Sequence, residues 1–290
     1  MIVRRLPQNP IIRPNMDPRM GDNVNGPSLI RVPDWIERPL GRYYLYFAHH
    51  DGRYIRLAYA DDLHGPWRTY EPGVLPLARS HFAGHIASPD VHVDEERRQL
   101  RLYYHGADEP SRVGGNQFSR VALSSDGLDF EARAENLGRP YMRVFRRKDW
   151  YYALAMPGVL YRSRDGLTGF EEGPTLFPST MRHSALKLDG DRLSVFFTSV
   201  GDCPERILLS TIDLSGDWLV WRASDPLPVL EPELEYEGGQ LVLEPSRRGL
   251  VMGPVRQLRD PAIYREDGRT YPLYSVVGEY GIAIGELLED

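Results

Sequence analysis

The stretch that decides the fold is residues 259–287, which read RDPAIYREDGRTYPLYSVVGEYGIAIGEL. It holds three short apolar or aromatic runs, and the gaps between them contain glycine and charged residues of the kind that form turns. Short apolar runs bounded by turn signals predict β-strands. No segment has the length and period of an amphipathic helix. The stretch therefore predicts a small antiparallel sheet.

Four further stretches follow the same order: a first strand, a polar turn, an aromatic strand, a loop, and a strand of small residues. They span residues 26–67, 88–131, 139–171 and 182–218. Five weakly similar units of this size indicate a radial β array. We therefore predict an all-β fold, a five-bladed β-propeller in which residues 1–290 form one domain. Residues 1–23 and 213–258 fit the repeat least well, and one of these segments is predicted to close the ring.

The composition excludes several classes of function. The 290 residues carry 35 Lys and Arg against 41 Asp and Glu, a net charge of −6, which argues against a nucleic-acid partner. Cys203 is the only cysteine, so an intrachain disulfide and a cysteine-based zinc cluster are excluded. No run approaches the ~18 apolar residues of a membrane span, and no secretory signal is visible. We expect a cytoplasmic protein without a membrane partner; the oligomeric state is not indicated.

Short motifs open three of the units. They are Arg259-Asp260-Pro261-Ala262-Ile263-Tyr264, Ser88-Pro89-Asp90-Val91 and Gly26-Pro27-Ser28-Leu29-Ile30. They resemble the blade starts of the five-bladed β-propeller glycosidases, the superfamily of arabinanases, β-xylosidases and α-L-arabinofuranosidases. The resemblance covers nearly the whole chain. It implies a glycoside hydrolase that cleaves a glycosidic bond of an oligosaccharide or glycoside in a central axial pocket.

The sequence departs from this superfamily at the catalytic positions. Gly26, preceded by Asn25, stands where the resemblance places the catalytic aspartate of the first blade. Arg182 and His183 stand where it places the general-acid glutamate. Asp90 alone matches, at the place of the aspartate that tunes the pKa of the acid. Because hydrolysis needs a general acid and a second carboxylate, the resemblance implies an atypical catalytic pair.

The first strands of all blades start near the axis of a propeller, so residues at these five places are predicted to converge. The catalytic candidates are Asp90, Asp260, Asp22 and His183. An imidazole with a pKa of about 6.5 serves as a general acid without burial, so His183 is the predicted proton donor. The predicted substrate-binding residues are Asn25, His85, Arg139, Arg182, Arg259, Glu279 and Glu237. The last two are also the next candidates for the acid.

Two alternatives stay open. A non-catalytic carbohydrate-binding propeller would explain the missing acid–base pair, whereas charged and imidazole side chains at the same places favour an enzyme with altered chemistry. His81, His85, His105 and Asp90 would also be acceptable metal ligands. They follow no fixed-spacing motif, so we predict no metal-ligating residues and no required cofactor. A divalent cation in the axial channel, as some relatives carry, is compatible with this expectation.

Overall fold

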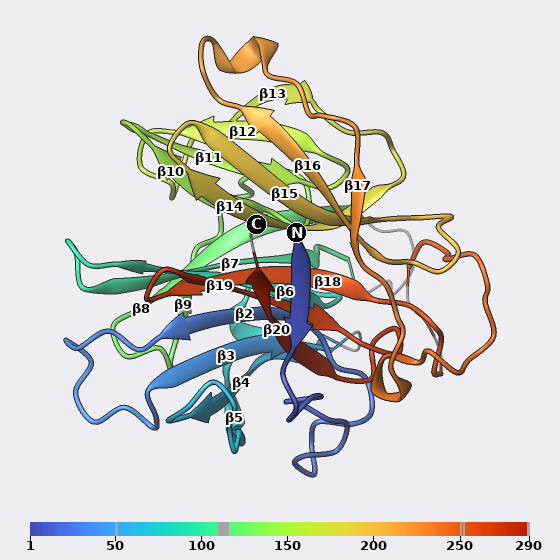
Figure 1. The fold of residues 1–290 in the computed structure, drawn as a ribbon. Coiled ribbons are helices and arrows are strands. Elements are labelled where there is room, and N and C mark those ends of the chain that lie inside the picture. Colours follow the sequence, from blue (N-terminus) through green and yellow to red (C-terminus); the bar gives the residue numbers. More distant parts are fainter. Residues whose placement is uncertain (50–51, 110–115, 250, 252, 289–290) are drawn as a thin grey trace.

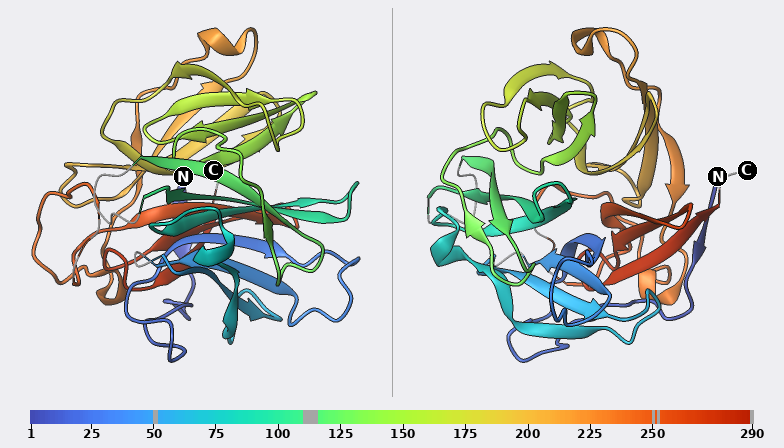
Figure 2. Two further views of the ribbon diagram at one scale, coloured as in Figure 1. Left: turned by 180° about the vertical axis from the view of Figure 1, so that it is seen from behind. Right: turned by 90° about the vertical axis from the view of Figure 1, so that its left-hand side faces the viewer.

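The structure is a computed structural model that describes residues 1–49, 52–109, 116–249, 251 and 253–288. These residues form five four-stranded antiparallel sheets around a common centre (Figure 2, right). The helical elements of the described ranges are three 3-10 turns, η1 (Leu77–Arg79), η2 (Trp218–Val220) and η3 (Glu235–Glu237). No helix there is long and apolar enough to cross a membrane. The predicted all-β, five-bladed propeller is confirmed.

In blades 1 to 4 the strands run in chain order from the axis to the rim, whereas the rim strand of blade 5 is the first strand of the chain. Blade 1 consists of β2 (Asn25–Arg31), β3 (Tyr43–Ala48), β4 (Tyr54–Ala60) and β5 (Arg68–Pro76), and blade 2 of β6 (Ile86–Asp94), β7 (Gln99–Ala107), β8 (Gln117–Ser124) and β9 (Glu131–Ala132). Blade 3 consists of β10 (Arg143–Arg147), β11 (Trp150–Ala155), β12 (Val159–Ser163) and β13 (Glu171–Thr175), and blade 4 of β14 (Met181–Asp189), β15 (Arg192–Ser199), β16 (Ile207–Asp213) and β17 (Leu227–Leu230). Blade 5 consists of β18 (Arg259–Glu266), β19 (Arg269–Ser275), β20 (Ile282–Leu288) and β1 (Ile2–Arg5).

The N-terminal strand closes the ring. β1 pairs antiparallel with β20, so the first strand of the chain is the rim of the last blade (Figure 1). Of the two segments that fit the repeat least well, residues 1–23 therefore supply the closing strand. The other segment, residues 213–258, supplies β17 and the turns η2 and η3 of blade 4 and its connection to blade 5.

An apolar cluster fills each of the five gaps between neighbouring blades. Strand β3 shows how one strand serves two gaps. Tyr43, Leu45 and Phe47 pack toward blade 5, whereas Tyr44 and Tyr46 pack toward blade 2. Because successive side chains of a strand point to opposite faces and both faces are covered, the inner strands read as uninterrupted apolar runs.

Polar contacts join neighbouring blades at the lower end of the propeller, by which we mean the end where the innermost strands finish. One contact links each pair of neighbouring blades. The five contacts are Arg31–Glu266, Arg265–Asp189, Arg147–Asp191, Arg146–Glu96 and Trp35–Glu95. Most of these side chains are exposed, so each contact is expected to contribute at most about 1 kcal/mol. The apolar clusters therefore dominate the stability of the ring.

We predict that Val3→Ala lowers the free energy of unfolding by about 1–3 kcal/mol, because Val3 is buried in the cluster between blades 4 and 5. Ile2 is its neighbour on β1 but is 62% exposed, so Ile2→Ala is a matched control with an expected effect within about 0.5 kcal/mol. Denaturant unfolding of both variants checks the prediction. Equal losses from the two substitutions would show that β1 does not close the ring in this register.

Candidate functional site

One residue near the start of each innermost strand has a left-handed backbone conformation. These residues are Gly26 (φ 61°), Ser88 (φ 50°), Tyr141 (φ 60°), His183 (φ 41°) and Asp260 (φ 44°). In blades 1, 2, 4 and 5 the strand register shifts beside this residue, as it does at a β-bulge. The five positions are therefore equivalent, and we call the level of the axis that they define the upper level.

Asp260, His183 and Arg182 form a row of polar groups at this level. Asp260 Oδ1 lies 3.2 Å from Nδ1 of His183. Nη2 of Arg182 lies 3.1 Å from Nε2 of the same imidazole. Ser275 Oγ donates a hydrogen bond to Asp260 Oδ2 at 3.4 Å. All four side chains are buried.

This arrangement determines where the imidazole proton lies. A guanidinium group only donates hydrogen bonds, so Nε2 of His183 accepts from Arg182 and carries no proton. The proton of a neutral imidazole is then on Nδ1, which faces Oδ1 of Asp260 at 3.2 Å. In this geometry His183 has no Nε2 proton to transfer.

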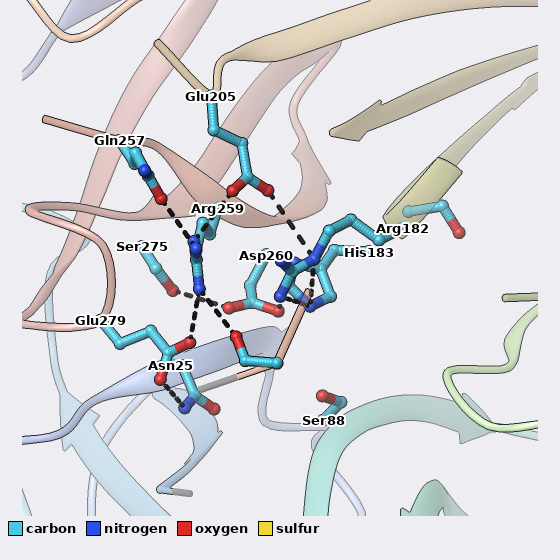
Figure 3. A network of polar contacts seen from close by, with 12 residues as sticks. Asn25, Ser88, Arg182, His183, Glu205, Gln257, Arg259, Asp260, Ser275 and Glu279 are labelled. Atoms are coloured by element: carbon cyan, nitrogen blue, oxygen red, sulfur yellow. Dashed lines mark hydrogen bonds and ion pairs between the residues drawn. The ribbon is translucent and has the colours of Figure 1, made fainter. Parts of the chain in front are cut away.

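Arg259 lies at the centre of a second group of buried charges (Figure 3). Its Nε lies 3.0 Å from Glu205 Oε2, its Nη1 lies 3.0 Å from Glu279 Oε1, and its Nη2 donates to Gln257 Oε1 at 2.7 Å. Glu205 Oε1 also lies 3.7 Å from Arg182 Nε, which connects the two groups. Since the side chains of Arg259, Glu205 and Glu279 are completely buried, their charges are tolerated only because they are paired.

Glu279 extends this network to blade 1. Its Oε2 accepts hydrogen bonds from Nδ2 of Asn23 at 2.7 Å and from Nδ2 of Asn25 at 3.3 Å. The backbone N–H of Val24 donates to the carbonyl oxygen of Glu279 at 2.6 Å. Hydrogen bonds to a carboxylate and a nearby guanidinium both favour its charged form. Glu279 is therefore an acceptor in this network and not a proton donor.

A row of rings runs from His183 toward blade 2. The ring of Tyr141 lies 4.9 Å from that of His183 and 4.0 Å from that of His105. His85, which is half-buried, meets His105 edge-on at 5.7 Å. Burial, and after it the charge of Asp260, raises the pKa of Tyr141 above its ordinary range. The phenol therefore stays protonated and can donate a hydrogen bond.

Asp90 does not occupy the equivalent place in blade 2. The equivalent residue is Ser88, because the bulge between Ala87 and Asp90 moves the aspartate further along the strand. Asp90 Oδ2 accepts a hydrogen bond from the N–H of Val144 at 2.9 Å and lies 2.8 Å from Nε2 of His92.

Arg143 lies between the strands that carry Asp90 and His183. Its guanidinium donates to the carbonyl oxygens of Pro89 and Ser184, both at 2.8 Å. The prediction that Asp90 shares one site with His183 and Asp260 therefore needs correction. His183 and Asp260 meet at the upper level, and Asp90 lies lower along the axis.

Three other predicted site residues lie outside the upper level. Asp22 is exposed, and its buried neighbour Asn23 reaches Glu279 instead. Arg139 is half-exposed and lies 3.8 Å from Glu172 on β13, at the rim of blade 3. Glu237 is buried in η3, where it binds the Arg5 guanidinium and accepts from the hydroxyl of Tyr274. Within the described ranges, no group of three or more His, Cys, Asp and Glu side chains could hold a metal ion.

Four axial residues were not among the sequence candidates: Asn23, Arg143, Glu205 and Gln257. Asn23 stands two residues before Asn25, so strand alternation alone would have placed both on one face. Glu205 and Gln257 come from connections that lie outside the repeated runs. The sequence around these two residues does not follow the repeated pattern of the blades, so it does not indicate an axial position.

No protein-family model matches the chain. It is 35% identical over 323 aligned residues to the uncharacterized protein R118 of Acanthamoeba polyphaga mimivirus, which covers 98% of this chain and 89% of that protein.

Two solved structures are similar in fold. The α-L-arabinofuranosidase from Lactobacillus brevis has a TM-score of 0.63 at 12% identity, over 97% of this chain and 93% of that one. A glycoside hydrolase family 43 β-xylosidase/α-arabinofuranosidase from a compost metagenome, in complex with xylotriose, has a TM-score of 0.64 at 13% identity, over 100% and 96%. The predicted resemblance to the propeller glycosidases is thus confirmed for the fold.

We predict that Arg259→Leu lowers the free energy of unfolding by about 3–5 kcal/mol, because Glu205 and Glu279 stay buried without their shared partner. Arg265→Leu, on the same strand but with a half-exposed ion pair to Asp189, is the control, with an expected loss of at most about 1 kcal/mol. Urea unfolding followed by circular dichroism compares the two. The network is not a main support of the fold if both variants lose the same stability.

The stabilising effect of Asp90 is predicted to disappear in acid. Burial alone would raise its pKa, but His92, Arg143 and the N–H of Val144 together hold the pKa of Asp90 below its ordinary value. A carboxyl group with a lowered pKa in the folded state stabilises the fold above its unfolded pKa of about 4, and this effect is lost as the pH falls through the folded pKa.

The stability difference between the wild type and Asp90→Asn should therefore shrink between about pH 7 and pH 3. Denaturant titrations at the two pH values measure it. A difference that grows in acid contradicts the direction of the shift.

Proposed function

The chain belongs to the same family as the mimivirus protein R118, and from its axial site we propose that it is a glycoside hydrolase with Asp260 as the working carboxylate. The single observation that carries this proposal is the backbone of Asp260. Its φ of 44° is a strained conformation for a residue other than glycine. Strain of this kind, about 1–3 kcal/mol, is characteristic of functional positions, where the side chain is needed in one place.

The neighbours of Asp260 suit a general base. Nδ1 of His183 lies 3.2 Å from one carboxylate oxygen and Ser275 donates a hydrogen bond to the other, so the group is held in one orientation. Arg182 keeps the imidazole in the tautomer whose Nδ1 proton faces Asp260. In the proposed reaction Asp260 removes a proton from the attacking water, the water oxygen forms the bond to the anomeric carbon, and the leaving group departs as its anion when the glycosidic bond breaks.

The general acid that the sequence suggests is not available in this arrangement. His183 presents an unprotonated Nε2 to Arg182, and Glu279 accepts hydrogen bonds from Arg259, Asn23 and Asn25. Protonation of the leaving group commonly contributes about 10²–10⁴-fold to hydrolysis. We infer that the reaction depends strongly on the leaving group and is faster on activated glycosides.

The substrates to test first are pentosides. Two of the similar solved structures are named as an arabinofuranosidase and a β-xylosidase/α-arabinofuranosidase, the latter bound to xylotriose. Sugar specificity varies widely within one fold, so this choice rests on analogy. Aryl α-L-arabinofuranosides and β-D-xylosides are therefore the starting panel.

Non-catalytic carbohydrate binding is the second candidate function. The observation in its favour is the burial of the upper level: Arg182 and Asp260 are 3% exposed and Glu279 is 0% exposed. The carbonyl oxygens of Arg247 and Gly249 accept hydrogen bonds from Arg182 and Arg259, so the segment that contains them covers the network. A sugar would have to displace this segment to reach Asp260.

We predict that Asp260→Asn lowers kcat/KM on aryl pentosides by about 10²–10⁴-fold. Asp189→Asn, a half-exposed aspartate at the lower end, is the matched control and should leave the rate unchanged. His183→Ala should reduce the rate by the same factor on good and poor leaving groups, because it acts through Asp260.

Two results would contradict the proposed mechanism. A larger loss on the poor leaving group for His183→Ala would assign the proton transfer to that imidazole after all. A wild-type protein that binds xylotriose in calorimetry but hydrolyses none of the aryl glycosides would support the binding function instead.

A further inference from the structure

A cavity lies on the axis below the upper level. It has a volume of about 150 Å³, and all five innermost strands line it. On each innermost strand, the residues that line the cavity come one to four positions after the residue with the left-handed backbone. Leu29, for example, comes three positions after Gly26, and Ala262 comes two positions after Asp260. The cavity is therefore a separate space further along the axis.

The two charged side chains of this cavity have complementary hydrogen-bonding capacity. Both bonds that Asp90 makes within the described chain use Oδ2, so Oδ1 is available as an acceptor. Arg143 uses Nε and Nη1 for the carbonyl oxygens of Ser88, Pro89 and Ser184, so in the same ranges Nη2 is available as a donor. A hydroxyl group both donates and accepts, so neighbouring hydroxyls match this pair.

The charges of the cavity favour an uncharged ligand. Asp90 is an ionised carboxylate beside the Arg143 guanidinium. An anionic ligand would therefore be repelled by Asp90, and a cationic ligand by Arg143. His92, the third titratable residue of the lining, is already bonded to Asp90. A neutral polyhydroxylated molecule loses no ionic solvation on entering such a site.

A groove between blades 2 and 3 continues from this cavity. It has a volume of about 280 Å³ and shares His92 and Val144 with the cavity. Asp94 lies 2.7 Å from Arg101 and Glu96 lies 4.0 Å from Arg146, whereas Glu95 accepts a hydrogen bond from Nε1 of Trp35. Tyr151 adds a half-buried aromatic ring. Cavity and groove together reach the size of small-ligand sites, roughly 300–1,000 Å³.

We propose that the lower axial cavity is a second ligand site that binds one neutral sugar ring, held by Asp90 and Arg143 and approached along the groove between blades 2 and 3. This site is independent of the proposed hydrolysis at Asp260. It needs no reaction, and its residues are not those of the upper level.

The test is calorimetric titration of the full-length protein with D-glucose, D-xylose and D-glucuronate. We expect at least one neutral sugar to bind and D-glucuronate to bind more weakly. Asp90→Asn should weaken binding of that sugar at least about tenfold. The reason is that a hydrogen bond accepted by a charged carboxylate is stronger than one accepted by a neutral amide. Leu186→Phe, which fills the cavity from β14, should have the same effect.

Two control variants separate this site from its surroundings. Asp189→Asn changes an aspartate of the lower end outside the cavity, and Asp260→Asn changes the upper level; neither should alter sugar binding by more than about twofold. Circular dichroism and a melting curve show that each variant is folded.

The proposal is overturned if no sugar binds at up to about 50 mM. It is also overturned if Asp90→Asn and Leu186→Phe bind as the wild type does, or if Asp260→Asn abolishes binding.

Discussion

The pairing of Arg259 with Glu205 and Glu279 is the interaction on which the axial region depends. Glu205 comes from the β15–β16 connection of blade 4, Arg259 from the first strand of blade 5, and Glu279 from the β19–β20 connection of the same blade. Through Asn23 and Asn25, Glu279 continues the network into blade 1. One buried cation thus joins three consecutive blades where the ring is closed, and the chain cannot lose it without leaving two carboxylates buried.

The left-handed residues explain how a repeated fold produces a non-repeated site. Each blade presents one side chain at the same place on the axis, and four of the five are not glycine, although glycine would relieve the strain. The fold thus supplies five equivalent positions, and the sequence assigns a different chemistry to each. Gly26 lies close to Ser88, where a Cβ would come within 3.1 Å of Ser88 Cα, Tyr141 supplies a protonated phenol, and His183 and Asp260 face each other at 3.2 Å.

The sequence predicts the blades well because each blade is determined by short apolar runs and by the turn residues between them. Strand β3 is apolar on both faces because both faces are covered by neighbouring blades. Similar turn residues recur in all five units. Gly26, His183 and Asp260 each stand at the start of such a run, and each has the left-handed backbone of its blade. Asp90 was misplaced because one bulge shifts the register, and Glu205 was missed because a buried ion pair between distant connections leaves no pattern in the chain. The proton position on His183 depends on Arg182 as a neighbour, which only the structure provides.

Imidazole ¹⁵N NMR of labelled protein measures where the proton lies in the row from Arg182 through His183 to Asp260. His183→Gln identifies the signals. At neutral pH we expect a neutral ring with the proton on Nδ1 and an unprotonated Nε2 that accepts a hydrogen bond. A doubly protonated ring, or a proton on Nε2, would contradict the account and return His183 to the role of proton donor.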